Sequence, residues 1–352
     1  MRVHGTHPYN AEPPPSALAG QVITPLDAFY ARDHGRVPVV DPAAWRLTVD
    51  GLVERPLELT LDDLRAGFPE RTVVATLQCA GNRRAGLLAV RDIPGEDPWG
   101  PGATSTASWT GAGLRDVLAR AGLTPDAAHI AFQGCDVSTE MSPPQPFGGS
   151  VPVIKATAPE VLLAWAMNGE PLPPVHGAPL RVVVPGWIGA RSVKWLTRVT
   201  ARATPSDNYY QAVAYRLLPA DPGMNGRAEA ITLGPVALNS AILSPGDGAR
   251  LAPGRTEITG YAYTGGGRAV ARVEVSLDGG STWHPADLGT SPGPWAWRHW
   301  RATADLPEGR TTIAVRAWDD AAATQPEDPR TVWNPKGYAN TSWHRVTVTC
   351  GP

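Results

Sequence analysis

In the last third of the chain, apolar and polar residues alternate with a period of two. Within residues 271–277 (ARVEVSL), every second residue from Val273 on is Val or Leu, and the residues between are polar. Residues 312–318 and 343–349 alternate likewise. This is the period of a half-buried β-strand, because successive side chains of a strand point to opposite faces. Several such runs without a helical segment between them predict a β-sandwich of immunoglobulin type.

The first two thirds of the chain mix strand and helix patterns. Residues 72–77 (TVVATL) and 180–185 (LRVVVP) are β-rich runs. Residues 60–66 begin with a threonine followed by acids, which is typical of a short helix. Residues 113–121 (GLRDVLARA) place their apolar residues on one helical face. These patterns predict short elements of both kinds.

Gly and Pro number 37 each and are scattered between the apolar runs, which favours many short strands joined by elaborate loops. Residues 219–230 (PADPGMNGRAEA) have the composition of a linker. A chain of 352 residues fits two domains, at roughly 100–200 residues per domain. The sequence therefore predicts a mixed first domain and a sandwich after the linker.

Charge and motifs exclude several classes of function. A net charge of −2 gives no electrostatic reason to expect nucleic acid or an anionic membrane as a partner. The sequence has no P-loop, HExxH, GxSxG or EF-hand pattern. Three cysteines without a CxxC pair argue against a disulfide framework and a Cys-rich zinc site.

Targeting signals are also missing from the sequence. No apolar stretch reaches 18 residues, so no membrane span is expected. The N-terminus (MRVHGTHPYNAEPPP) has neither an apolar segment nor a twin-arginine pair. These observations favour a cytoplasmic location, or a periplasmic one if a leader has been removed.

Cationic residues gather near one cysteine. Arg83 and Arg84 follow Cys79 closely, and the segment 176–194 adds one His, two Arg and a Lys. Arginine presents a fork of donors that matches oxyanions. Taken singly, a cysteine after a β-rich run is most often a small core residue, and arginine pairs are usually solvated. The combination is what suggests an anion site.

Together, several segments resemble one family. TLQCAGNRR (76–84), FYARDHGRVP (29–38) and PPVHGAPLRVVVPGWIGARSVKWL (173–196) resemble the molybdopterin domain shared by sulfite oxidases and assimilatory nitrate reductases. VEVSLDGGSTW, QPEDPRTVWNPKGY and WHRV resemble the C-terminal dimerisation domain of that family. The resemblance implies an α+β, β-rich molybdopterin-binding domain over residues 1–219 and an immunoglobulin-like β-sandwich over residues 220–352. It also implies a homodimer.

The resemblance assigns site residues as well. Cys79 corresponds to the one protein ligand of molybdenum, and its thiolate is the ligating form. Four residues correspond to the catalytic site: Arg32, Arg84, Tyr215 and Lys336. Eight correspond to residues that bind the molybdopterin: Tyr30, His34, Asp136, His176, Arg181, Ser192, Val193 and Lys194.

The sequence departs from the family pattern at two positions. Asp33 stands where the family commonly has Asn, which predicts a carboxylate beside Arg32 that weakens anion affinity. Lys336 stands where animal sulfite oxidases carry Arg, so a point charge replaces a bidentate fork.

The chemistry implied is oxidation of sulfite to sulfate by oxygen-atom transfer. The sequence has no haem motif and no flavin or nicotinamide fingerprint, so a separate electron acceptor, such as a cytochrome c, is expected. The alternatives are a nitrate reductase-like or sulfoxide-reducing molybdoenzyme of the same family, or a cofactor-binding protein without turnover.

Overall fold

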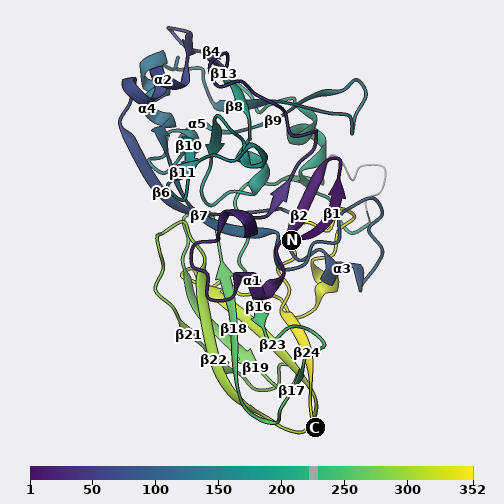
Figure 1. Cartoon of the computed structure of the whole chain (residues 1–352). Coiled ribbons are helices and arrows are strands. Elements are labelled where there is room, and N and C mark those ends of the chain that lie inside the picture. Colours follow the sequence, from purple (N-terminus) through teal and green to yellow (C-terminus); the bar gives the residue numbers. More distant parts are fainter. Residues whose placement is uncertain (222–228, 352) are drawn as a thin grey trace.

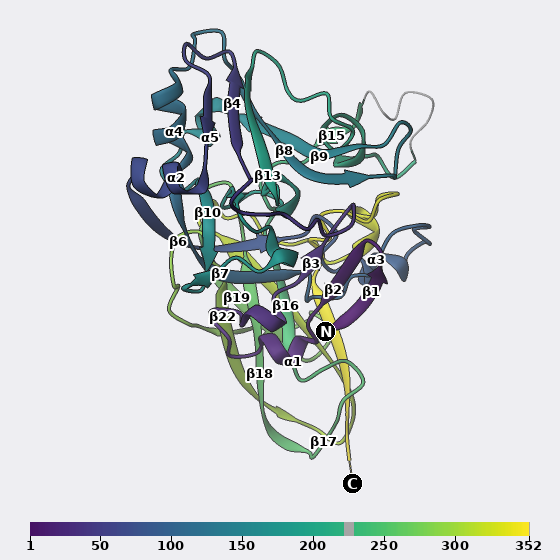
Figure 2. The same ribbon diagram turned by 45° about the horizontal axis from the view of Figure 1, so that its top comes forward.

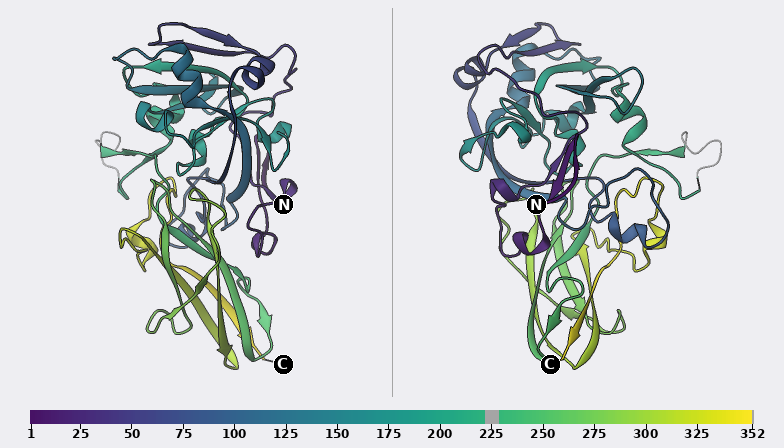
Figure 3. Two further views of the ribbon diagram at one scale, coloured as in Figure 1. Left: turned by 90° about the vertical axis from the view of Figure 1, so that its left-hand side faces the viewer. Right: turned by 45° about the vertical axis from the view of Figure 1, so that its right-hand side comes forward.

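The computed structural model describes residues 1–221 and 229–351. The first part of the chain forms the upper half in Figure 1, and the C-terminal third forms an elongated sandwich below it. The N-terminus lies near the level where the two halves meet, and the C-terminus lies at the far end of the sandwich (Figures 1 and 3). The predicted division at residues 219 and 220 stays a prediction, since residues 222–228 of the expected linker lie outside the described part.

The upper half contains two five-stranded sheets and a small three-stranded one. One large sheet joins β6 (Glu70–Gln78), β7 (Thr104–Gly113), β10 (Leu162–Met167), β11 (Glu170–Pro171) and β12 (Arg181–Val183). The other has the order β5 (Leu57–Leu59), β4 (Leu47–Gly51), β13 (Leu196–Arg202), β8 (His129–Ser138), β9 (Gln145–Pro152). The small sheet joins β1 (Arg2–Thr6), β2 (Tyr9–Glu12) and β3 (Ala31–Arg32). The predicted runs at 72–77 and 180–185 correspond to β6 and β12.

The helices in the first part of the chain are short. They are α1 (Pro15–Leu18), α2 (Leu61–Gly67), α3 (Ala85–Leu88), α4 (Leu114–Ala121) and α5 (Val153–Ala156). Thr60 caps α2: its hydroxyl accepts from the Asp63 amide at 3.0 Å, and the Asp63 carboxylate accepts from the Thr60 amide at 2.9 Å. Gly122 ends α4 with a φ of 72°, a conformation that suits glycine. Figure 2 shows α2, α4 and α5 together on one side of this half.

Single turns and short bridging strands complete this half. The turns are η1 (Leu26–Ala28), η2 (Pro174–His176), η3 (Gly189–Arg191) and the π-turn η4 (Tyr210–Ala214). The bridging strands β14 (Arg216–Leu217) and β15 (Ile231–Thr232) pair with each other. Among the described residues, no helix is long and apolar enough to cross a membrane.

The C-terminal third is the predicted sandwich. One sheet has the order β16 (Asn239–Ser244), β18 (Gly254–Tyr263), β22 (Arg298–Leu306), β21 (Asp287–Leu288). The other has the order β17 (Arg250–Leu251), β24 (His344–Cys350), β23 (Gly309–Asp319), β19 (Val270–Ser276), β20 (His284–Pro285), and the turn η5 (Pro329–Thr331) precedes β24. Ile258 and Trp300 of the first sheet pack in one buried cluster with Val273 and Ile313 of the second. The alternating residues thus fill the space between two sheets.

The two halves meet through buried hydrogen bonds. Thr76 of β6 donates its amide to Trp295 O at 3.0 Å, and its hydroxyl accepts from the Trp297 amide at 2.8 Å. Tyr263 of β18 donates its hydroxyl to Thr76 O at 3.3 Å. The fully buried Trp297 ring therefore lies at the junction of the two halves.

A loop of the sandwich reaches the loop that follows β6. Ala339 donates its amide to Ala80 O at 2.8 Å, and the Asn340 side chain donates to Arg83 O at 2.8 Å. Arg83 in turn donates to Ser342 O at 2.7 Å. Residues 80–83, directly after Cys79, are thus held by the C-terminal half of the chain.

Candidate metal and cofactor site

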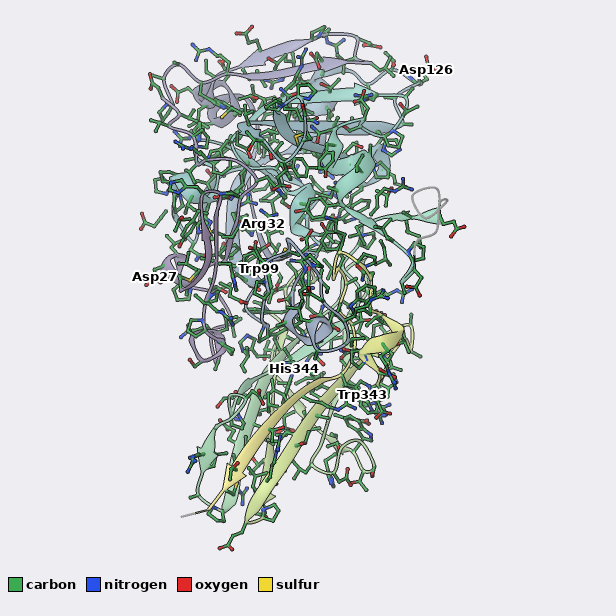
Figure 4. All side chains as sticks on the ribbon, turned by 90° about the vertical axis from the view of Figure 1, so that its right-hand side faces the viewer. Asp27, Arg32, Trp99, Asp126, Trp343 and His344 are labelled. Carbon is green, nitrogen blue, oxygen red and sulfur yellow. The ribbon has the colours of Figure 1, made fainter. Side chains whose placement is uncertain are left out.

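A cavity opens beside Cys79. Its lining comes from β3, the loop after β6, β8, η2, β12 and η3, which lie far apart in the sequence. Ten predicted site residues line it together: Tyr30, Arg32, His34, Cys79, Asp136, His176, Arg181, Ser192, Lys194 and Tyr215. Figure 4 places Arg32 in the middle of the molecule, above the sandwich residues Trp343 and His344. The motifs predicted from sequence therefore converge on one cavity.

Cys79 sits where β6 gives way to a tight turn. Its amide donates to Ala103 O at 2.9 Å, and its Sγ accepts from the Gly81 amide at 3.4 Å. Burial raises the pKa of the Cys79 thiol, while the Arg84 and Arg32 guanidinium groups act to lower it. Among the described residues, no group of three or more His, Cys, Asp or Glu side chains is placed to hold a metal ion. The cavity thus offers a soft metal one thiolate ligand.

Three cations surround the cavity: Arg32, Arg181 and Lys194. Arg181 is buried and donates to His176 O at 3.0 Å and to Ser192 O at 2.9 Å. Burial lowers the pKa of Arg181 to about 10, so it remains protonated at neutral pH. Lys194 donates to Val175 O at 3.0 Å and contacts the Asp33 carboxylate. These charges favour an anionic ligand such as a phosphate.

Several buried polar atoms at the cavity have no hydrogen-bond partner among the described residues. They are Asp33 Oδ2, Asp136 Oδ1 and Arg181 Nε. Burial raises the pKa of Asp136 to about 7, an effect that Lys194 partly opposes. Buried polar groups are nearly always hydrogen-bonded, so these atoms indicate a ligand with both donors and acceptors. The amino groups and the phosphate of a molybdopterin fit this donor and acceptor set.

His34 connects the cavity to the surface. Its Nε2 lies 2.7 Å from the Tyr215 hydroxyl, and its Nδ1 lies 2.8 Å from Glu140 Oε1. Burial and then Arg32 lower the pKa of His34 to about 3, which keeps the imidazole neutral. A neutral ring with Nδ1–H donating to Glu140 can accept the Tyr215 hydroxyl proton at Nε2. The arrangement fixes the Tyr215 hydroxyl at the cavity.

Three further residues were predicted to bind the cofactor: His176 and Ser192 line the cavity, and Val193 does not. Burial, then Lys194 and Arg181, lower the pKa of His176 to about 3. Ser192 lines the cavity, and its hydroxyl accepts from the Val184 amide at 3.0 Å. The Val193 side chain packs in the hydrophobic core instead, so a cofactor contact there would have to come from its backbone.

Arg84 and Lys336, two of the predicted catalytic residues, lie outside this lining and next to each other. Arg84 Nε donates to Lys336 O at 2.9 Å. Both side chains contact Glu96: Arg84 Nη2 lies 3.1 Å from its Oε2, and Lys336 Nζ lies 2.8 Å from its Oε1. Although burial raises the pKa of the Cys79 thiol, the positive charge of Arg84 acts to lower it.

Comparisons with known proteins agree with this geometry. A family model described as an oxidoreductase molybdopterin binding domain matches residues 34–210, and a Mo-co oxidoreductase dimerisation domain matches residues 232–351. Mitochondrial sulfite oxidase of Mus musculus is 43% identical over 367 residues, covering 100% of this chain and 66% of the relative. The chain belongs to the sulfite oxidase family. It thus spans about two thirds of the length of the mouse relative.

Two further family comparisons cover most of both chains. Sulfite oxidase of Arabidopsis thaliana is 40% identical and covers 100% of this chain and 94% of the relative. The crystal structure of the sulfane dehydrogenase SoxCD from Paracoccus pantotrophus is 29% identical with a TM-score of 0.85, covering 98% of this chain and 85% of that one. These matches confirm the predicted fold class, a β-rich molybdopterin-binding domain followed by a β-sandwich.

One detail predicted from the sequence is wrong. Asp33 was expected to place its carboxylate beside Arg32, but that carboxylate contacts Lys194, and Arg32 reaches only the Asp33 backbone oxygen. The carboxylate that approaches Arg32 is Glu140, whose Oε1 lies 3.8 Å from Arg32 Nη2. Asp33 directly follows the end of β3, and its carboxylate is directed to Lys194 of a different segment.

Sequence reasoning missed Glu96 and Glu140. Both lie in loops outside the segments that resemble the family. The available signal was physical: a buried arginine needs hydrogen-bond acceptors, and an acid is a strong one. Arg84 is 2% exposed, and Glu96 provides its charged partner.

Proposed function

We propose that this chain oxidises sulfite to sulfate by oxygen-atom transfer at molybdenum held by Cys79, and passes the electrons to a separate acceptor such as a cytochrome c. The observation that carries the proposal is the placement of Cys79 and Arg32 on one buried cavity whose unpartnered polar atoms fit a molybdopterin. The sulfite oxidase names of the relatives support the choice of substrate.

When bound, the molybdenum cofactor supplies the oxygen atom and takes up the two electrons of the reaction. Overall, sulfite and water give sulfate, two protons and two electrons. Arg32 would orient the oxyanion, since its guanidinium faces the cavity near Cys79. The Tyr215 hydroxyl, fixed by His34, would hold or move a proton beside the reacting oxygen. Burial of the Tyr215 side chain limits the access of bulk water to its hydroxyl.

The cofactor would be held by the remaining residues of the cavity. Arg181 and Lys194 supply positive charge for the phosphate, and Asp136 supplies a carboxylate for the amino groups. Arg84 and Lys336 would add positive charge on the substrate side, from the junction of the two halves. Arg84 would act more strongly, because its side chain is buried and Lys336 is 40% exposed.

Sulfite-dependent reduction of ferricyanide by the molybdenum-loaded protein tests the proposal. We expect turnover with sulfite, saturable and inhibited by sulfate, because both anions would occupy the same cationic site. The comparison is the reduction of nitrate or of a sulfoxide, with a reduced viologen dye as the electron donor. Faster turnover with either of these would replace sulfite oxidation by one of the alternatives. A loaded protein that turns over none of them would be a cofactor-binding protein only.

We also propose that the chain forms a homodimer through the sandwich. The match to a dimerisation domain over residues 232–351 supports this, and a two-fold dimer is the commonest symmetric assembly. Light scattering at micromolar concentration is expected to give twice the chain mass of 37.3 kDa. A mass of one chain under these conditions would rule out the dimer. A cytoplasmic location, with the periplasm as the alternative, stays a proposal that cell fractionation can test.

A further inference from the structure

One carboxylate, Glu96, lies between two cations that the proposed function assigns to the substrate side. Each of its oxygens contacts a different cation: Oε2 is 3.1 Å from Arg84 Nη2, and Oε1 accepts a hydrogen bond of 2.8 Å from Lys336 Nζ. The Glu96 side chain is 13% exposed and belongs to the loop between α3 and β7. The three groups together carry one net positive charge instead of two.

This cluster is held in place from both halves of the molecule. Arg84 donates from Nε to Lys336 O and from Nη1 to Asp97 O, each at 2.9 Å. Its guanidinium also lies 5.4 Å from the centre of the Tyr338 ring. Three of the five N–H groups of Arg84 thus contact protein partners. Among these partners, Glu96 carries a charge.

The cluster lies one aromatic layer away from the cavity. The Tyr338 ring stacks on the Tyr215 ring, with centroids 5.5 Å apart and planes 19° apart. Tyr215 lines the cavity, and Arg84 packs against the Tyr338 ring. Because the Tyr338 and Tyr215 rings between the cluster and the cavity are buried, water screens a charge change at Glu96 only weakly from an anion in the cavity.

We propose that Glu96 tunes the anion affinity of the cavity: its carboxylate offsets part of the positive charge of the Arg84–Lys336 pair, so that an oxyanion bound beyond Tyr338 and Tyr215 is attracted less strongly. The inference rests on the proposed function for the identity of the oxyanion. An internal carboxylate of this kind weakens the binding of substrate and product alike. For a small dianion held by several cations, weaker product binding helps sulfate to leave.

Glu96→Gln in the cofactor-loaded enzyme tests this. Glutamine keeps the size of the side chain and removes its charge. Calorimetric titration with sulfate, which needs no turnover, is expected to show at least tenfold tighter binding, about 1.4 kcal/mol. KM for sulfite is expected to fall by a similar factor while kcat does not rise, because sulfate leaves more slowly.

Glu327→Gln is the matched control. Glu327 also pairs with an arginine, Arg345 at 3.1 Å, but on the exposed surface of the sandwich. Glu327→Gln changes the net charge of the chain as much as Glu96→Gln does, and it is expected to leave sulfate binding unchanged. Adding Arg84→Gln to Glu96→Gln is expected to cancel the gain, since the released cation is then missing.

Three results would overturn the proposal: unchanged sulfate affinity in folded Glu96→Gln, an equal gain in Glu327→Gln, or a gain that survives Arg84→Gln. Should Glu96→Gln fail to fold, Glu96→Ala serves instead, because it removes the same charge and the same gain in sulfate affinity is expected. Tighter sulfate binding in an enzyme that does not oxidise sulfite would support the role of Glu96 and defeat only the proposed function.

Discussion

Cys79→Ser is expected to lower sulfite oxidation by at least about a thousandfold, equivalent to about 4 kcal/mol in the barrier. A serine hydroxyl is protonated at neutral pH, whereas the thiolate is the form of cysteine that binds a metal. The fold is expected to survive, because the Cys79 amide still donates to Ala103 O and the side chain keeps nearly its size. Ferricyanide reduction measures the loss, and metal analysis with pterin fluorescence measures what stays bound.

The other two cysteines provide the controls. Cys135 is half-buried on β8 and Cys350 is buried in the core of the sandwich. Neither lines the cavity among the described residues, so Cys135→Ser and Cys350→Ser are expected to leave turnover nearly unchanged. Near-normal activity in Cys79→Ser, or a comparable loss in both controls, would contradict the assignment of Cys79 as the metal ligand.

The elements that sequence predicts well are those set by local physics. The alternation in residues 271–277 predicts β19, and the capping box at Thr60 predicts the start of α2. Both signals act within a few residues of the chain. The parallel pairing of β13 with β4 could not be predicted in this way, because it joins residues about 150 positions apart without a local signal.

The candidate site shows the same difference between local and long-range signals. Cys79 and Arg32 were predicted because their motifs are specific, although nothing local shows that they share a cavity. The sequence did not predict the acidic residues that these motifs contact. Glu140 meets His34 across 106 positions and Glu96 meets Lys336 across 240, and each carboxylate comes from a loop whose sequence has no pattern. The first contact is fixed by the packing of the first domain and the second by the packing of the two halves, and both depend on residues far apart in the chain.

Asp136→Asn is expected to weaken retention of the molybdopterin by at least about a hundredfold. Asp136 Oδ1 is buried at the cavity without a partner, so it is free to accept from the pterin amino groups. Hydrogen bonds to a charged group contribute roughly 1.5–3 kcal/mol each, and two of them account for this factor. The asparagine side chain would also present its N–H donors to the pterin amino groups, which are donors themselves. Pterin fluorescence after dialysis measures the effect, with Asp126→Asn, an exposed site far from Arg32 in Figure 4, as the control.

The same substitution is expected to stabilise the cofactor-free protein. Burial raises the folded-state pKa of Asp136 to about 7, above the usual value near 4, with Lys194 opposing and Asp33 adding to the shift. Between these values the folded protein binds more protons at this site than the unfolded chain, so the Asp136 side chain costs increasing stability as pH rises from 4 to 7. Asparagine does not titrate, so the gain from Asp136→Asn should be absent at pH 4 and reach about 1–3 kcal/mol above pH 7. Denaturant unfolding of the cofactor-free proteins at both pH values measures it. A variant less stable than the wild type at pH 8 would show that Asp136 is satisfied within the protein and does not await a ligand.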